Sequence, residues 1–262
     1  MTILSINKTT GQNANTRIGC FLFSLKGKIM NELILIVSLA AIFGSTLLAY
    51  RLFGKTGLFA LNAIVTVLAN IEVLILINAF GMEQTLGNIL FASTYLITDI
   101  LSENEGKKSA NRAVNIDIFA AVIMVVITQS WFLYDTSVND WVFPHIQSIF
   151  STTPRLMLAS LLGYAVSQRM DVWLYHKWWN FTAKKFGDTY RFLWLRNNGS
   201  TLISQIINTI IFNTVAFAGV YSTKTFISII ISSYIIYIAT SLLDTPFVYI
   251  ARKMKTSGKI PD

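Results

Sequence analysis

The sequence predicts an all-α fold, a polytopic bundle of about seven transmembrane helices. Apolar residues make up 53% of the chain and charged residues 13%, about half the charge content of an average soluble domain. Apolar runs of about 18 residues or more, long enough for a helix to cross a bilayer, recur along the chain. The candidate spans are residues 33–50, 57–80, 86–103, 113–134, 154–176, 200–220 and 225–250.

The chain begins with a polar extension, residues 1–29, that is rich in Thr, Asn and Lys. Its one apolar run, residues 18–25, is too short to span a membrane and lacks the small-residue cleavage site of a signal peptide. We therefore expect the extension to be disordered. Met30 directly precedes the first span, and our hypothesis is that it is the physiological start, although a start at the first residue stays open. The remainder divides into a single transmembrane domain, residues 30–252, and a cytoplasmic tail, residues 253–262.

The boundaries of two later spans carry charged residues. The third span is short and ends in Asp99 and Glu103. The fifth span opens with Thr153, a residue type that caps helices, followed by Pro154 in the first turn. This start places Arg155 close to the outer face of the membrane.

The basic residues sort to one side of the predicted bundle. If the seven spans alternate, fourteen Lys and Arg fall on one face of the membrane and five on the other. The positive-inside rule then puts the N-terminus outside and the C-terminus in the cytoplasm. The net charge of +8 is therefore interpreted as a topology signal, and nucleic acid is not expected as a partner.

The sequence lacks the residue sets of common catalytic and metal sites. Cys20 is the only cysteine, which excludes a disulfide framework and a thiolate metal site. The two histidines, His145 and His176, fall on opposite sides of the predicted membrane, so a histidine metal site or a serine hydrolase is not expected. Gly54 and Lys55 echo a phosphate-binding loop but lie between two apolar spans. We predict no enzyme, no cofactor and no metal.

Two consecutive spans carry the same polar pattern. One contains the run Ser167-Gln168-Arg169-Met170-Asp171, and the next contains Ser204-Gln205-Ile206-Ile207-Asn208. A spacing of three places each amide and its Asp or Asn on one helix face. Because polar groups at membrane depth face the bundle interior or a watery path, the two helices are expected to form the two sides of a polar solute site.

Further polar residues lie within or at the ends of the spans, and they mark a substrate or proton route or else hold helices together. Such helix–helix hydrogen bonds are worth about 0.6 kcal/mol on average. Carboxylates and carboxamides suit the hydrogen-bonding edge of a guanine-like heterocycle. The residues are Glu72, Asp99, Glu103, Asp117, Arg155 and Asp244.

Three ordered motifs resemble signatures of the queuosine precursor transporters, a family first described as vitamin-uptake-like. They lie at the end of the third span, along the fifth span and at the start of the sixth. The motif residues are 97–103 with 106–110; 155–160 with Ser167, Gln168 and Asp171; and 193–197 with Ser200, Thr201, Gln205, Asn208 and Phe212. The resemblance covers about residues 57–252. Many members are expected to carry Asp where this chain has Asn208, and the first span is additional to a six-helix family core.

The resemblance implies import of a 7-deazaguanine-type base, such as preQ0, preQ1 or queuine, across the bacterial inner membrane for transfer-RNA modification. It implies a helical bundle similar to the vitamin-binding components of energy-coupling transporters, without their ATPase partners. The implied partners are a small planar nitrogenous base and the lipid bilayer. The resemblance leaves open which precursor is carried and whether the chain forms a homo-oligomer.

Our mechanistic hypothesis places the solute between the fifth and sixth helices. Asp171 would accept from the donor edge of the solute, Gln168 or Gln205 would serve its acceptor, and Ser204 and Asn208 would complete the set. Arg155 and Arg196 would pair with acids such as Asp99 or Glu103. Proton coupling, if it occurs, would use Asp99, Asp171 or Asp244.

Two alternatives stay open. The chain would be a capture subunit that needs a separate ATPase, or a non-transporting assembly protein in which the polar pairs hold helices together.

Overall fold

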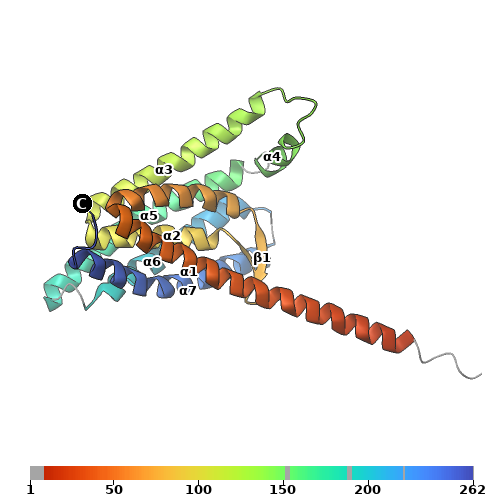
Figure 1. Cartoon of the computed structure of the whole chain (residues 1–262), viewed down its shortest axis with the longest axis horizontal. Helices are drawn as coiled ribbons and strands as arrows, with labels where there is room; N and C mark the ends of the chain where they lie inside the picture. Colours follow the sequence, from red (N-terminus) through yellow and green to blue (C-terminus); the bar gives the residue numbers. More distant parts are fainter. Residues whose placement is uncertain (1–8, 151–153, 188–190, 221, 262) are drawn as a thin grey trace, which may run out of the picture.

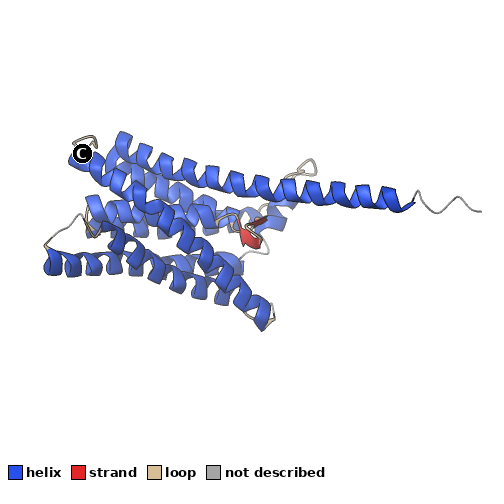
Figure 2. Cartoon of the chain, turned by 90° about the horizontal axis from the view of Figure 1, so that it is seen from below, coloured by secondary structure: helices blue, strands red, loops and turns tan. Residues whose placement is uncertain are grey.

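The structure, a computed structural model, describes residues 9–150, 154–187, 191–220 and 222–261. The described chain forms a helical bundle with one small β-hairpin (Figure 1, Figure 2). Its elements are α1 (Thr9–Glu72), β1 (Leu76–Ala79), β2 (Met82–Thr85), α2 (Asn88–Asn104), α3 (Lys107–Ser130), a 3-10 turn (Trp131–Leu133), α4 (Phe143–Phe150), α5 (Pro154–Phe186), α6 (Leu193–Phe217) and α7 (Thr223–Thr256). The all-α membrane bundle predicted from the sequence is confirmed.

Within the described residues, four segments are long and apolar enough to cross a membrane, namely Met30–Glu72, Lys107–Leu133, Leu193–Phe217 and Ile229–Thr256. The bundle has the inverted surface of a membrane protein, because apolar side chains cover its outside while polar groups lie within. Exposed apolar residues include Ile36, Ile64, Phe119, Val126, Ile206 and Leu242. The buried polar residues include Asn62, Asp99, Gln168, Asp171, Arg196 and Asp244.

The first two predicted spans are both parts of α1, which folds back on itself at Gly54. This residue has φ 58° and ψ −147° inside the helix, a conformation that glycine adopts without steric cost. The C-terminal residues pack closely against this corner, because a Cβ at position 54 would lie 2.7 Å from the Pro261 carbonyl oxygen. Gly54 and Lys55, which echo a phosphate-binding loop in the sequence, therefore lie at the bend between the two halves of α1.

Replacement of Gly54 by Ala is expected to lower the free energy of unfolding by about 1–3 kcal/mol, the usual cost of a residue held in a sparsely populated backbone region. The matched control is Gly44→Ala, because a Cβ at Gly44 meets no atom within 4 Å and Ala is the better helix former. Thermal unfolding of the detergent-solubilised protein measures both changes. Equal melting of the two variants would contradict the steric account of the corner.

The second predicted span, residues 57–80, extends too far, because α1 ends at Glu72 and a hairpin follows. Strand β1 pairs antiparallel with β2, with Leu76 opposite Thr85. Phe80 and Gly81 form the turn with φ values of 52° and 73°, the backbone twist that two-residue hairpins prefer. The Glu32 carboxylate accepts from the Phe80 amide at 2.8 Å, which fixes the hairpin to α1.

The N-terminal region differs from the expectation as well. Residues 9–29, which we expected to be disordered, are helical and continue into the rest of α1. The proposed start at Met30 and the domain boundaries stay predictions. The predicted helix cap Thr153 lies outside the described residues.

Helix α2 occupies the centre of the bundle and is buried along nearly its whole length. It packs against α1, α3, α5 and α7, while α5 and α6 form a closely packed antiparallel pair. The α1 corner, the end of α2 and the end of α7 meet at one end of the bundle, where Glu105 binds Tyr50 at 2.7 Å and Lys255 at 2.9 Å. The hairpin and α4 lie at the opposite end (Figure 1).

Candidate polar translocation site

A set of buried polar side chains follows α2 through the bundle and meets polar side chains of α5, α6 and α7. The register of α5 against α6 decides which of them share a level. Ser204 bonds Asp171, and a Cβ at Gly163 would lie 2.8 Å from the Asn208 Oδ1. In this antiparallel register Gln168 and Gln205 lie at the same level.

Three buried acids form the middle of the site. Asp99, Asp171 and Asp244 are at most 1% exposed. Each accepts one hydrogen bond from α6: Thr201 Oγ1 donates to Asp99 at 3.1 Å, Ser204 Oγ to Asp171 at 2.8 Å, and Asn197 Nδ2 to Asp244 at 2.8 Å. Helix α6 therefore presents neutral donors to acids from three other helices.

Two of these acids keep an oxygen available for a ligand. Among the described residues, Asp99 Oδ1 and Asp171 Oδ2 are buried and have no hydrogen-bond partner. The two carboxyl groups lie close enough to interact electrostatically. A buried carboxylate oxygen without a donor is costly, so this pair is suited to accept N–H donors or protons.

The carboxamides lie one turn away from the acids. Gln168 Nε2 donates to Thr94 Oγ1 at 2.9 Å, and its Oε1 accepts from Thr98 Oγ1 at 3.1 Å. On α6, Asn208 Nδ2 donates to Gln205 Oε1 at 3.3 Å. Both glutamines are buried. Gln168 thus contacts α2 directly, a partner that the sequence pattern did not indicate.

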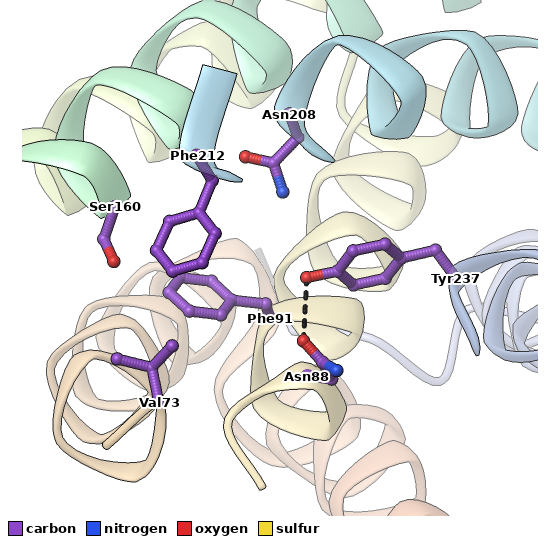
Figure 3. Close-up of a pocket in the computed structure, with 7 residues that line it drawn as sticks. All are labelled: Val73, Asn88, Phe91, Ser160, Asn208, Phe212 and Tyr237. Carbon is purple, nitrogen blue, oxygen red and sulfur yellow. Dashed lines mark hydrogen bonds between the residues drawn. The ribbon is translucent and has the colours of Figure 1, made fainter. Parts of the chain in front are cut away.

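A small cavity lies beside Asn208, between the carboxamides and the hairpin end of the bundle. It is lined by Val73, Asn88, Phe91, Ser160, Asn208, Phe212 and Tyr237 (Figure 3). Tyr237 donates to Asn88 Oδ1 at 3.0 Å across one wall. The volume of the cavity, measured as the space open to the centre of a water molecule, is about 20 Å³. This volume suits about one water molecule. The cavity is therefore too small for a heterocyclic base in this conformation.

The opposite end of the polar path is closed by a charged cluster. Arg196, fully buried, donates two hydrogen bonds to Glu103 at 2.8 and 2.6 Å. Glu103 also accepts from Tyr175 at 2.6 Å and from Arg252. The Arg196 guanidinium lies 4.2 Å from the centre of the Trp179 ring. The structure thus shows the expected Arg196–Glu103 pair, and it ties α2, α5, α6 and α7 together.

Among the residues that the structure describes, Arg155 does not pair with an acid, contrary to the expectation. It is exposed and donates to the carbonyls of Val215 at 2.6 Å and Ala218 at 2.7 Å. The last carbonyls of a helix lack intrahelical partners, so Arg155 satisfies the end of α6. It therefore lies away from the acids.

The repeated polar pattern does not include the residues that orient the acids and amides. Thr94, Thr98, Thr201 and Asn197 make these hydrogen bonds. A signal existed, because Thr98 and Thr201 lie within the recognised motifs. Hydroxyl side chains in apolar helices often bond their own backbone, so their sequence positions do not reveal an interhelical role.

The comparisons with known proteins agree with this architecture. A family model described as "Putative vitamin uptake transporter" matches residues 85–251. A Bacillus subtilis (strain 168) protein named "Probable queuosine precursor transporter" is 36% identical over 208 residues, which are 79% of this chain and 89% of that protein. No solved structure matches the chain. This multi-pass membrane protein belongs to the family of the queuosine precursor transporters, the vitamin-uptake-type proteins that its motifs resemble.

Proposed function

We propose that the protein imports queuosine precursors, which are 7-deazaguanine-type bases, across the bacterial inner membrane for transfer-RNA modification. In this proposal the N-terminus is outside and the C-terminus is cytoplasmic. The name of the Bacillus relative supports this class of cargo. The observation that carries the proposal is the pair of unpartnered buried oxygens, Asp99 Oδ1 and Asp171 Oδ2, because a guanine-like edge supplies the N–H donors that they need.

The arrangement of the polar path supports an order of events. The base enters beside Asn208, where the cavity lies, and passes Gln168 and Gln205 to reach the acids. Release at the C-terminal end requires the Glu103–Arg196 cluster to separate, because this cluster joins four helices there. Transport thus alternates between opening the cavity end and opening the charged end.

A complementation experiment tests the function. A bacterial strain that can neither make the precursor nor import it receives this gene and is supplied with the nitrile, the amine or the free base in turn. Queuosine in its transfer RNA is measured by mass spectrometry. At least one compound is expected to restore the modification, and failure with all three at normal membrane abundance refutes the proposal.

The variant Gln205→Ala extends this test to the site. Loss of its hydrogen bonds is expected to reduce uptake about tenfold, which corresponds to about 1.4 kcal/mol. Gln147→Ala is the matched control, because Gln147 is exposed on α4. This helix lies at the hairpin end of the bundle, away from the acids in its middle (Figure 1). Equal uptake by the two variants would remove Gln205 from the site.

A structural role is the second candidate, and one observation favours it: Gln168 already bonds Thr94 and Thr98 through both of its polar groups. If the polar residues only join helices, Gln205→Ala lowers membrane abundance and leaves uptake per molecule unchanged.

The third candidate, a capture subunit with a separate ATPase, predicts that the purified chain alone in liposomes exchanges no base.

A further inference from the structure

A second buried polar cluster lies outside the path just described. It contains Asp117 of α3, Asn62 and Thr66 of α1, and Tyr164 of α5, and we name it the Asp117 cluster. Asp117 and Asn62 are fully buried, and Thr66 and Tyr164 are 1% and 4% exposed. Four polar side chains from three helices thus meet without access to solvent.

The contacts in the Asp117 cluster use only part of its oxygen atoms. Tyr164 donates to Asp117 Oδ2 at 2.6 Å, and Asn62 Nδ2 donates to the same oxygen. Asp117 Oδ1, Asn62 Oδ1 and Thr66 Oγ1 are buried with no hydrogen-bond partner among the described residues. Asn62 and Thr66 are four residues apart on one face of α1, and Thr66 adjoins the Tyr164 hydroxyl. The unpartnered atoms are all oxygens.

Protein cations do not reach this carboxylate in the described structure. The α1 helix presents neutral Asn62 and Thr66, and α5 presents the Tyr164 phenol. The arginines of the neighbouring turns point elsewhere: Arg112 lies 6.0 Å from the centre of the Phe59 ring, and exposed Arg169 bonds Asn115 at 3.2 Å. A buried carboxylate without a positive partner is strongly destabilising, and a small cation would relieve this cost.

We propose that the Asp117 cluster binds a small monovalent cation, a proton or Na⁺, that couples to transport of the base. Oxygen ligands are the type that hard cations prefer. The proposal rests on the proposed import function, but the cation site itself does not depend on the identity of the cargo.

Tyr164 links the Asp117 cluster to the polar path. Its ring lies 6.3 Å from that of Phe91, which lines the cavity beside Asn208. Its backbone carbonyl accepts from Ser167, and Ser167 in turn accepts from Tyr95 at 2.7 Å. A cation that competes for the Asp117 oxygens changes the Tyr164 hydrogen bond and thereby the wall of the cavity. Coupling then follows because the cation favours one of the two path conformations.

Cation binding is tested first without any base. Melting of the purified full-length protein is recorded in choline buffer with and without Na⁺, and across a pH series. The wild type is expected to melt at a higher temperature with Na⁺ or, for the proton, as the pH falls. Asp117→Asn should lose the Na⁺ effect or flatten the pH dependence, while Asp135→Asn, an exposed loop control, retains the wild-type response. Identical responses in the Asp117 variant and the wild type would overturn the site.

Coupling is tested in proteoliposomes with a labelled 7-deazaguanine base. Asp117→Asn is expected to keep base exchange within about twofold of wild type and to lose accumulation driven by an imposed proton or Na⁺ gradient. Loss of exchange as well, or full gradient-driven accumulation, overturns the proposal. If the wild type exchanges no base, the import function fails, and the melting series still decides the cation site.

Two milder variants keep the proposal testable if Asp117→Asn does not fold. Tyr164→Phe preserves the ring on Phe91 and is expected to lower the ratio of gradient-driven accumulation to exchange at least about threefold; an unchanged ratio contradicts the link.

Thr66→Val removes one unpartnered oxygen. It should weaken Na⁺ binding severalfold if Na⁺ is the ligand and leave proton coupling intact, so it distinguishes the two cations. The Asp117 cluster is refuted as a coupling site if Thr66→Val keeps both Na⁺ binding and proton coupling and Tyr164→Phe keeps the wild-type ratio of accumulation to exchange.

Discussion

Replacement of Asp171 by Asn is expected to reduce uptake of a 7-deazaguanine base at least about tenfold, because a hydrogen bond to a charged group contributes about 1.5–3 kcal/mol. The carboxylate has one oxygen bonded by Ser204 and one without a partner. Asn retains an oxygen for Ser204 and nearly the same volume. It replaces the free oxygen with an N–H group, which repels the donor edge of the base.

The measurement is the initial uptake rate of labelled base, normalised to the amount of protein in the membrane. Asp135→Asn makes the same chemical change in an exposed loop and should retain the wild-type rate. A rate for Asp171→Asn within about twofold of wild type would show that the base does not contact this acid. In that event Asp99, the neighbouring buried acid with an unpartnered oxygen, becomes the residue to replace next.

Replacement of Glu103 by Ala is expected to cost about 3–5 kcal/mol of unfolding free energy, the usual cost of removing one partner of a buried ion pair. The side chains of Glu103 and Arg196 are both fully buried where they meet. Removing the acid leaves the Arg196 charge inside the bundle. It also releases Tyr175, whose hydroxyl donates to Glu103 at 2.6 Å.

The double variant Glu103→Leu with Arg196→Leu is the informative comparison. It removes both charges, so it should be more stable than Glu103→Ala although it changes one residue more. Arg252 is only partly buried and can turn toward solvent in this variant. Denaturant unfolding of the solubilised protein measures both. If the double variant is the less stable of the two, packing rather than the isolated charge explains the effect.

The sequence pattern predicted which faces of α5 and α6 carry buried polar groups but few of their hydrogen-bond partners. The repeated Gln/Asp and Gln/Asn spacing correctly placed Gln168 and Gln205 on inward faces, since lipid excludes unpaired polar groups from outward faces. It did not reveal that Gln168 bonds α2, because its partners Thr94 and Thr98 lie about seventy residues earlier in the chain. Arg155 was misassigned for the same reason, since its partners are carbonyl groups that every residue possesses.

Two features of the fold escaped prediction because their sequences are ambiguous. Residues 76–79 are apolar enough to resemble the end of a span, but they form strand β1, which pairs with β2 across a positive-φ turn at Phe80 and Gly81. The short apolar run of α2 resembled a marginal span. It is instead the buried centre of the bundle, which explains how it carries Asp99 and Glu103 without contacting lipid.

The sequence by itself determined the membrane class, the helical fold, the family and the inward faces of α5 and α6. The family follows from the three ordered motifs. The other properties follow from composition and helical period, because the cost of exposing charge to lipid acts on each helix separately. Only the tertiary structure decided which polar groups meet. It brought Asp99 to Asp171, bound Glu103 to Arg196, and set Asp117 apart in its own cluster, because these pairings depend on the register between helices that are distant in the chain.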